Sequence, residues 1–389
     1  MRILLVGNYA LDKQSSMLRY ADMLCRQMTE RGHEVEVIQP GPVVGDLARR
    51  GILRKWLGYV DKYILFPAKL RARSRGFDLV HICDHSNSVY LPHTGGRPSS
   101  ITCHDVLAIA SARGQYSEQN ISSTGRAQQR WILKHLAAAR NVVCVSANTA
   151  RELAALSPPL KDGAARNICV IPNALNFDYT RAPDEVVLAL RQRLGLAEGE
   201  RYLMHIGGDQ WYKNRMGVLR IFERLSRTLG DAGRPPLRLV MAGSPWPETM
   251  RSFVAGHRLE RQVVELADPS NADLCALYSG ATALLFPSLY EGFGWPVVEA
   301  QSCGCPVIAS NRKPMTEVAG DAALYIDPAD EAGAAALIAA SLDGLAGLRE
   351  AGLRNVERFS SDRIVPAYER FFLQVAASAT PPAIVRVTD

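Results

Sequence analysis

The sequence contains few of the patterns that mark exported, membrane-spanning or metal-binding proteins. Its eight cysteines include no Cys-x-x-Cys pair, no run of about 18 apolar residues occurs, and the first residues do not resemble a signal peptide. These absences predict reduced thiols and a cytoplasmic location. Cys303 and Cys305 flank Gly304, but no further Cys or His lies nearby at metal-ligand spacing, so we expect two small buried side chains.

Two ligand-binding motifs are also absent. The loop that begins at Gly7 lacks the Gly-x-Gly-x-x-Gly fingerprint, which argues against an oxidoreductase that uses a nicotinamide cofactor. No Asp-x-Asp motif occurs anywhere in the chain, and we predict no bound metal and no cofactor. Ser15 and Ser16 end the first loop before a predicted helix, where hydroxyls can cap the helix or bind phosphate.

The length and composition predict two α/β domains. A chain of 389 residues suggests two domains of roughly 150 to 200 residues each, which its 47% hydrophobic content can fill. Short apolar runs, separated by segments long enough for crossover helices, predict two mostly parallel, doubly wound sheets. The expected strands cover residues 1–7, 34–38, 79–82, 100–103, 142–145 and 168–171 and, after a polar stretch at 176–200, residues 202–206, 237–242, 263–266, 283–286 and 306–309.

The positive charge is concentrated in one segment. The net charge is +6, yet residues 49–75 carry nine Lys or Arg and one acidic residue, Asp61, while the rest of the chain carries 36 basic and 38 acidic residues. The segment also contains Trp56, Tyr59 and Tyr63. This mixture predicts either an ordinary amphipathic helix that packs on a sheet or a peripheral contact with the inner face of an anionic membrane. We expect no nucleic-acid partner, because no recognised nucleic-acid module accompanies the charge.

Two carboxylates eight residues apart form the most informative motif. The apolar run before Pro287 predicts a buried strand that delivers Glu291 into a loop, and Pro296 suits the first turn of the next helix, which would place Glu299 in that turn. Gly292 and Gly294 allow the backbone to approach a ligand closely. The amides of a helix start attract phosphate oxygens, although a glutamate there can also simply offset the helix dipole.

The whole stretch reads Pro287-Ser-Leu-Tyr-Glu-Gly-Phe-Gly-Trp-Pro-Val-Val-Glu-Ala-Gln-Ser-Cys-Gly-Cys-Pro-Val-Ile-Ala-Ser and resembles the signature of the retaining glycosyltransferases of family 4. The resemblance implies the GT-B fold, in which two Rossmann-like domains face a cleft and the last helix crosses back to the amino-terminal domain. It predicts an acceptor-binding domain at 1–178 with about 363–380, and a nucleotide-sugar domain at 179–362. It also implies that Glu291 faces the donor sugar and that Glu299 binds the ribose.

A second stretch, His205-Ile-Gly-Gly-Asp-Gln-Trp-Tyr-Lys-Asn-Arg, resembles the Gly-Arg-x5-Lys motif of the same family. Departure of a nucleoside diphosphate needs positive charge, and the resemblance assigns this role to Lys213. The arginine of the motif is replaced by Gly208, which leaves open whether Arg215 compensates. Besides Glu299, the residues expected to bind the donor are Gly207, Gly208, Asn214, Arg215, Leu266, Gly292, Phe293 and Gly294.

His104 follows a predicted strand of the first domain, at the edge where α/β sheets bind ligands. The resemblance implies that it faces the donor sugar. His81, Asp84 and His85 follow the preceding strand and are expected on the acceptor side with Ser15 and Ser16. Family members generally work without a catalytic metal, which agrees with the expected absence of a metal site.

These observations predict a retaining, metal-independent hexosyltransferase. It would move a hexose from GDP-mannose or a UDP-hexose to a glycan or lipid-linked acceptor in the assembly of surface polysaccharide or glycolipid. The alternatives are a nucleotide-sugar epimerase or hydrolase on the same fold and a non-catalytic sugar-nucleotide-binding scaffold. The base, the sugar and the acceptor stay open, because base recognition is expected from backbone groups near Leu266.

Overall fold

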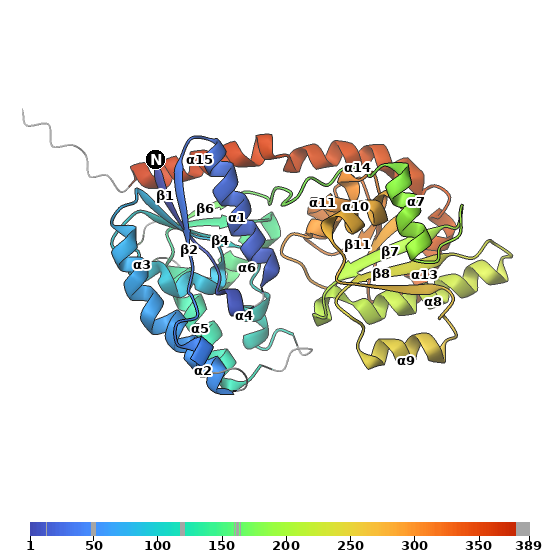
Figure 1. The fold of residues 1–389 in the computed structure, drawn as a ribbon, viewed down its shortest axis with the longest axis horizontal. Helices are drawn as coiled ribbons and strands as arrows, with labels where there is room; N and C mark the ends of the chain where they lie inside the picture. Colours follow the sequence, from blue (N-terminus) through green and yellow to red (C-terminus); the bar gives the residue numbers. More distant parts are fainter. Residues whose placement is uncertain are drawn as a thin grey trace, which may run out of the picture. The chain divides into compact units, whose positions relative to one another are not determined.

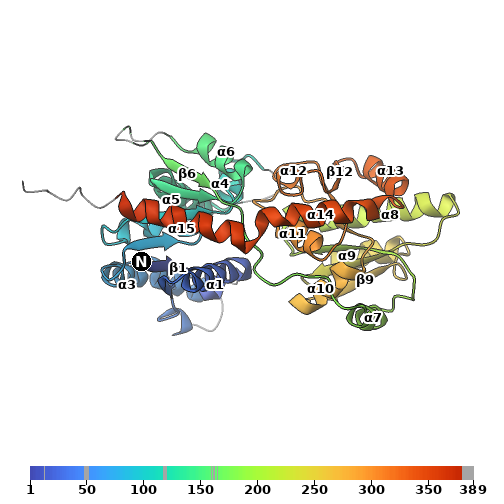
Figure 2. The same ribbon diagram turned by 90° about the horizontal axis from the view of Figure 1, so that it is seen from above.

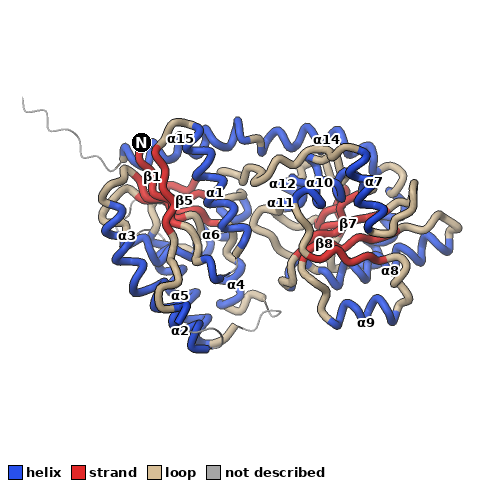
Figure 3. The backbone as a smooth tube through the Cα atoms, viewed as in Figure 1, coloured by secondary structure: helices blue, strands red, loops and turns tan. Residues whose placement is uncertain are grey.

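The computed structural model describes the chain except for Lys13, residues 48–51, 117–120, 159, 161–162, 164 and 379–389, and except for the side chains of Ser15 and residues 52–55. The chain forms two compact units. Unit 1 consists of Met1–Asn176 with Ser361–Asp389, and unit 2 consists of Phe177–Ser360. Each unit contains one six-stranded parallel sheet with helices on both sides (Figure 1, Figure 3).

The sheet of unit 1 has the strand order β2-β1-β3-β4-β5-β6, and every neighbouring pair is parallel. Its strands are β1 (Arg2–Val6), β2 (Glu34–Ile38), β3 (Leu79–Ile82), β4 (Ser99–Cys103), β5 (Asn141–Cys144) and β6 (Asn167–Val170). Its helices are α1 (Ser15–Glu30), α2 (Ile52–Val60), α3 (Phe66–Ser74), α4 (Leu107–Ala112), α5 (Ser123–Ala138), α6 (Ala147–Leu156) and α15 (Ser361–Ala377), with a π-helical turn η3 (Asp61–Leu65) and a 3-10 helix η4 (His85–His93).

Alternation along the strands gives this sheet two different faces. One face packs against α3, η4 and α5. On the other face, His81 of β3 lies 2.8 Å from Ser100 Oγ and 3.0 Å from Thr102 Oγ1, and its ring centre is 4.9 Å from that of Phe372 in α15. Burial lowers the pKa of His81 to about 3. His81 was expected on the acceptor side, and this was wrong: it lies within β3, inside the predicted strand 79–82, and belongs to the core.

The last helix packs on unit 1. Tyr368 of α15 shares a 2.6 Å hydrogen bond with Tyr20 of α1, and Gln27 of α1 donates a 3.2 Å hydrogen bond to Ser361. The contacts of α15 with β3 and β4 place it across the face that carries His81 (Figure 2). The prediction that the final helix returns to the amino-terminal half is confirmed.

The sheet of unit 2 has the order β12-β11-β10-β7-β8-β9 and is also parallel. Its strands are β7 (Tyr202–Gly207), β8 (Arg238–Gly243), β9 (Val263–Ala267), β10 (Ala283–Phe286), β11 (Val307–Ser310) and β12 (Leu324–Ile326). Its helices are α7 (Asp184–Arg193), α8 (Arg215–Asp231), α9 (Glu248–Gly256), α10 (Asn271–Gly280), α11 (Trp295–Ser302), α12 (Met315–Val318), α13 (Glu331–Ser341) and α14 (Leu348–Val356).

Each strand order contains one switch point, where the chain proceeds outward in opposite directions from two neighbouring strands. In unit 2 these strands are β7 and β10, and in unit 1 they are β1 and β3. Ligands of open α/β sheets bind beyond the carboxyl ends of the strands at such a point. The loops after these four strands are therefore the places to look for function.

The eleven predicted strands are found to within one residue at each end. The structure adds β12, and it adds α7 inside the stretch that was read only as polar. Among the described helices, none alone has the length and apolar character to span a membrane, although the bent pair Glu331–Ser341 and Leu345–Ala377 meets the criterion by length and composition.

Candidate functional site

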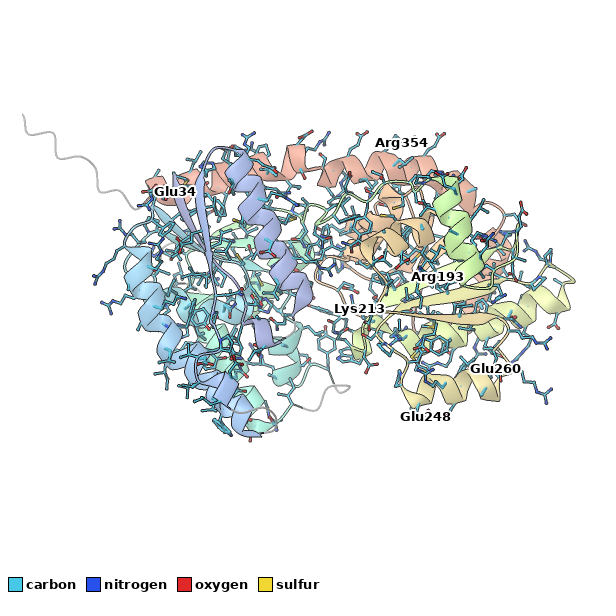
Figure 4. All side chains as sticks on the ribbon, in the orientation of Figure 1. Glu34, Arg193, Lys213, Glu248, Glu260 and Arg354 are labelled. Atoms are coloured by element: carbon cyan, nitrogen blue, oxygen red, sulfur yellow. The ribbon has the colours of Figure 1, made fainter. Side chains whose placement is uncertain are left out.

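Two loops of unit 2 bring a lysine and a glutamate together at the switch point. Lys213 ends a 3-10 turn (Trp211–Lys213) that follows β7, and Glu291 lies between β10 and α11. Lys213 Nζ donates to Glu291 Oε1 at 2.8 Å and to Oε2 at 3.1 Å, and the two side chains are only 18% and 8% exposed. Lys213 lies near the ends of β7 and β8, whereas Glu248 and Glu260 lie toward α9 (Figure 4). Two predicted catalytic residues thus form one sheltered ion pair.

One backbone and one side-chain hydrogen bond join the same two loops to each other. The amide of Leu289 donates to the Tyr212 carbonyl at 2.8 Å, and Asn214 Nδ2 donates to the Pro287 carbonyl at 3.0 Å. Asn214 adopts a left-handed backbone conformation with φ of 54°, a region in which asparagine is enriched. These bonds hold Lys213 and Glu291 in register. Asn214, which was expected to bind the donor, is seen here as a link between the loops.

Glycines bring the ends of β7 and β8 into close contact. A Cβ on Gly207 would lie 2.9 Å from His205 Nε2 and 3.3 Å from the Cβ of Lys213, so a side chain there would displace the lysine. Gly208 lies beside the side chain of Gln210. Gly243, at the end of β8, has φ of 124°, and a Cβ there would lie 2.2 Å from the Gly207 carbonyl oxygen. Only glycine fits at Gly243.

Helix α11 presents the second glutamate. The helix begins at Trp295 after Gly294, whose φ of 96° is left-handed, and Glu299 is its fifth residue. The expectation that Glu299 lies in the first turn was therefore wrong, because the left-handed glycine allows the helix to start one residue before Pro296. Glu299 is buried and accepts a 3.0 Å hydrogen bond from Tyr278 of α10. Burial and the charge of Glu299 raise the pKa of the Tyr278 phenol, so the phenol stays a donor.

Arg215 opens α8 immediately after the lysine turn. Its guanidinium is buried and donates to the Ser244 carbonyl at 2.6 Å, while its Nη1 lies 3.6 Å from Asp209 Oδ1, beyond hydrogen-bond distance. In the described part of the chain its Nε and Nη1 have no hydrogen-bond partner. Burial lowers the pKa of the neighbouring His205 to about 4, so that imidazole is neutral. Arg215 is thus a second buried cation near Lys213, and two of its nitrogen atoms have no hydrogen-bond partner in the described part of the chain.

The other expected donor residues are more dispersed. Phe293 is buried against Phe359, with ring centres 5.4 Å apart. Gly292 lies between Glu291 and Phe293 in the loop. Leu266 lies in β9, two strands away from β7, and pairs with Ala242. The structure brings Lys213 and Glu291 into contact and places Leu266 apart from them.

The switch point of unit 1 holds a buried polar network. Asn8, after β1, donates to Asp84 Oδ2 at 2.6 Å and accepts from Asn87 Nδ2 at 3.0 Å. Asp84, after β3, forms a 3.1 Å ion pair with His85. Burial lowers the pKa of His85, but the negative charge of Asp84 outweighs burial and raises the pKa to about 9. Burial opposes ionisation of Asp84, yet His85 holds its pKa far below the usual range. The pair is charged at neutral pH.

His104 lies directly after β4, as predicted, and is buried. Its Nε2 lies 2.9 Å from the Cys83 carbonyl oxygen, and its ring meets that of Tyr20 edge-on with centres 4.6 Å apart. Burial lowers its pKa, and the Asp84 charge offsets only part of that effect. A neutral imidazole that is hydrogen-bonded at Nε2 results.

Neither Ser15 nor Ser16 stands at the N-cap position, which was one of the two roles expected for them. Both lie inside α1, whose N-cap position is Gln14, and no side chain caps it. The helix starts one residue earlier than a serine cap would require. Over the residues that the structure describes, no group of three or more His, Cys, Asp or Glu is placed to hold a metal ion.

Two family models match the chain. The one described as Glycosyltransferase Family 4 matches residues 17–179, and the one described as Glycosyl transferases group 1 matches residues 187–351. The chain belongs to these glycosyltransferases. The matches cover most of both units and the switch point of unit 2, whereas β1 and the loop after it lie before the first match.

Relatives of this glycosyltransferase include O-antigen chain mannosyltransferase B of Escherichia coli, which is 30% identical over 247 residues, or 63% of this chain and 61% of that protein. The match thus spans less than two thirds of that relative. O-antigen chain mannosyltransferase RfbU of Salmonella typhimurium is 24% identical over 74% of this chain and 71% of its own length. Sucrose-phosphate synthase of Thermosynechococcus elongatus superposes with a TM-score of 0.74 at 18% identity, over 97% of this chain and all of that one. The α/β two-domain GT-B fold is confirmed.

Some residues around the candidate site gave no sequence signal. Tyr278 lies 21 residues before Glu299 and meets it only because α10 and α11 pack together. Asn8 meets Asp84 only because β3 is the neighbour of β1. The second contact could have been anticipated from a strand order with β3 beside β1, but no local pattern identifies that order.

Replacing Gly243 with alanine is expected to destabilise the protein. The new Cβ would meet the backbone of Gly207, which cannot move aside as a flexible side chain would, and the left-handed φ adds strain. We expect a loss of about 2 kcal/mol or more in the free energy of unfolding, measured by denaturant titration. Gly230→Ala is the matched control, because its Cβ would meet nothing within 4 Å and it lies in α8. Equal stability of Gly243→Ala and the wild type would contradict the close approach.

The Asp84–His85 pair predicts a pH dependence of stability. The pKa of His85 in the folded protein, about 9, is higher than its ordinary value of 6.5. Its contribution to the free energy of unfolding is therefore complete below about pH 6.5 and is lost as the pH rises through 9. We expect the melting temperature of the wild type to fall by several degrees more than that of His85→Asn between these values, by differential scanning calorimetry at each pH. Parallel curves for the two proteins would show that the pair is not charged in the folded state.

Proposed function

We propose that this protein transfers a hexose, with mannose as the first candidate, from a nucleoside diphosphate sugar to a hydroxyl of a glycan or lipid-linked acceptor. The observation that carries the proposal is the sheltered Lys213–Glu291 pair at the switch point of unit 2. Two relatives named as O-antigen chain mannosyltransferases favour mannose, and GDP-mannose is then the first donor to test.

Lys213 and Arg215 would stabilise the leaving diphosphate. An ammonium group has three N–H donors, and two of those of Lys213 already point to Glu291, which leaves one for a phosphate oxygen. Arg215 adds the Nε and Nη1 donors that lack partners, and it stands at the start of α8, where helix amides favour an anion. Arg215 would thereby replace the cation that Gly208 removes from the family motif.

The carboxylates would act on the sugar and the ribose. Glu291 would accept hydrogen bonds from the donor sugar and offset the positive charge that develops at its anomeric carbon. Glu299, with one oxygen bound to Tyr278, would accept from the ribose hydroxyls. Tyr278 thus positions the carboxylate. The assignment of His104 to the donor sugar stays a prediction from the family resemblance.

We infer a retaining, front-face reaction without a metal. The bond from the anomeric carbon to the diphosphate oxygen breaks, and its electron pair stays on the diphosphate. The acceptor oxygen bonds to the same face of the anomeric carbon, and its proton passes to the departing phosphate oxygen. No protein nucleophile is needed, and the chain supplies charge and orientation.

A donor-panel assay tests this proposal. The purified protein is incubated in EDTA with GDP-mannose, UDP-glucose or UDP-N-acetylglucosamine, with and without an extract of lipid-linked glycans, and products are followed by mass spectrometry. Acceptor-dependent formation of a hexosylated product, whose linkage keeps the donor configuration by NMR, is expected. Donor consumption without acceptor would identify a hydrolase or epimerase instead, and a donor that binds but is never consumed would identify a scaffold.

A further inference from the structure

Four exposed apolar side chains of unit 1 lie on α2, η3 and α5. Trp56 is 57% exposed, Ile64 65%, Leu65 39% and Trp131 39%. We call these four residues the aromatic face. Val43 and Leu47, in the turn that contacts α2, are exposed as well. Single exposed apolar residues are ordinary, but a cluster that includes two tryptophans marks an interaction surface.

Ring contacts join the two helices that carry the aromatic face. The ring centres of Trp56 and Tyr59 are 5.7 Å apart, and those of Tyr63 and Trp131 are 5.0 Å apart. Gln128 of α5 also donates to Tyr63 Oη at 2.9 Å. Tyr63 of η3 therefore connects α5 to the segment that carries Trp56 and Ile64. The π-helical turn η3 winds more widely than an α-helix, which keeps Ile64 on the same side as Trp56 two turns earlier.

Most of the charges described around the aromatic face are positive, and the acidic residues near it include Asp46, in the turn that contacts α2, and Asp12, which pairs with Lys62. Helix α5 carries Arg126, Arg130 and Lys134 at spacings of four and contains no acidic residue. By sequence, α2 adds Arg54 and Lys55. Asp61 is buried and accepts hydrogen bonds from the amides of Val44 and Gly45 at 2.9 Å, so its charge does not offset these cations at the surface.

The later part of the basic segment does not share this character. Phe66 and Leu70 of α3 are buried in the core, and Arg73 pairs with Glu36 of β2. Residues 66–75 therefore form the ordinary amphipathic helix that the sequence also allowed. Residues 49–51, at the other end of the segment, lie outside the described part of the chain. The candidate interaction surface therefore consists of α2, η3 and α5. Trp131 of α5 belongs to it although it lies outside the basic segment 49–75.

The inner side of η3 is bound to the loop that follows β1. Tyr9 donates to Asp61 Oδ2 at 3.1 Å, and Lys62 Nζ lies 3.0 Å from Asp12. Lys62 also lies 5.5 Å from the ring centre of Tyr9 and 5.2 Å from that of Tyr59. That loop carries Asn8 at the switch point of unit 1, so these contacts connect the aromatic face to the switch point.

We propose that the aromatic face docks on an anionic lipid bilayer and holds the loop after β1 at the membrane surface. Tryptophans and isoleucine would enter the headgroup region while the cations of α2 and α5 meet anionic lipids. Such a placement suits a lipid-linked acceptor, and in this respect it rests on the proposed function. Binding to the bilayer requires neither the sugar donor nor the sugar acceptor.

Vesicle flotation without sugar nucleotide tests the docking. The probe is a set of vesicles that mix phosphatidylglycerol with phosphatidylcholine, beside pure phosphatidylcholine vesicles. The wild type is expected to float with the anionic vesicles, less so as salt is raised. Trp56→Ser/Ile64→Ser and Arg130→Glu/Lys134→Glu are each expected to bind about tenfold more weakly or worse. Val186→Ser/Leu188→Ser is the matched control, because these residues of α7 are 42% and 46% exposed, and it is expected to bind like the wild type.

Three results would overturn the docking proposal. The first is failure of the wild type to float, and the second is equal binding by Trp56→Ser/Ile64→Ser with an unchanged melting temperature. The third is a lipid-free dimer, seen by analytical ultracentrifugation, that the same variant converts to a monomer, because the face would then join two copies of this chain. Failure of sugar transfer affects none of these readouts.

Hydrogen exchange tests the link to the loop. Addition of anionic vesicles is expected to slow amide exchange in residues 56–65 and also in residues 7–12 of the wild type. In Lys62→Met, which loses the contact with Asp12, the slowing is expected in residues 56–65 alone. Unchanged exchange in residues 7–12 of the wild type on vesicle binding would contradict the coupling.

Discussion

Glu291→Gln is expected to lower turnover by about a hundredfold to a thousandfold, the range seen when one group that stabilises transition-state charge is removed. Glutamine keeps the size of the side chain and can still accept a hydrogen bond from Lys213, but it carries no charge. The positive charge at the anomeric carbon then loses its carboxylate, while the two hydrogen bonds that join the loops stay intact. The change should appear in kcat with the preferred donor and acceptor.

The matched control for this variant is Glu331→Gln. Glu331 is also a partly buried, ion-paired glutamate of unit 2, but it pairs with Arg220 on the pair of helices α8 and α13. The Glu331→Gln variant should keep wild-type turnover. If Glu291→Gln turned over like the control while melting at the wild-type temperature, Glu291 would have no part in transfer.

Lys213→Met is expected to lower turnover at least as much and to weaken donor binding as well. Methionine is similar in length to lysine but removes the ammonium group, which lies 5.5 Å from the ring centres of Tyr212 and Phe286 and which the leaving diphosphate needs. It also leaves Glu291 buried without its cation, which adds a stability cost of about 3 kcal/mol at most for a pair that is partly exposed. Steady-state kinetics and calorimetric titration with the donor measure the two effects.

Comparison of single and double variants separates charge stabilisation from mere folding defects. If Lys213 and Glu291 act as one unit, Glu291→Gln/Lys213→Met should be little slower than Lys213→Met alone. Arg220→Met, which breaks the control ion pair, should leave turnover unchanged. Full activity of Lys213→Met, or equal losses in Lys213→Met and Arg220→Met, would remove Lys213 from the reaction.

Patterns along the chain predicted the fold well because buried parallel strands are short apolar runs between helices. The strand 283–286 was predicted residue for residue, and with it the loop that presents Glu291. Lys213 was found from a motif that ends a strand and opens a helix. Their 2.8 Å contact could not be predicted from these motifs alone. It depends on the pairing of β10 with β7, and two strands and three α-helices separate these strands in sequence.

Other features depend on packing that no local pattern contains. His81 alternates onto the face covered by α15, nearly 290 residues later, and hence belongs to the core. Trp131 joins the aromatic face only because α5 packs beside Tyr63. The start of α11 depends on a left-handed glycine, and a glycine in sequence does not state which conformation it adopts. The sequence therefore predicts which loops carry the candidate site, but not the exact place of every residue within them.

The most direct test of the account is a calorimetric titration of the purified protein and of Glu299→Ala with GDP-mannose, UDP-glucose and an ADP- and a TDP-sugar, without added metal. The wild type is expected to bind nucleoside diphosphate sugars that carry one particular base. Glu299→Ala is expected to bind the same donors at least about tenfold more weakly, with an unchanged unfolding transition. Absence of binding to every donor by a protein that unfolds cooperatively would contradict a nucleoside diphosphate sugar site in unit 2.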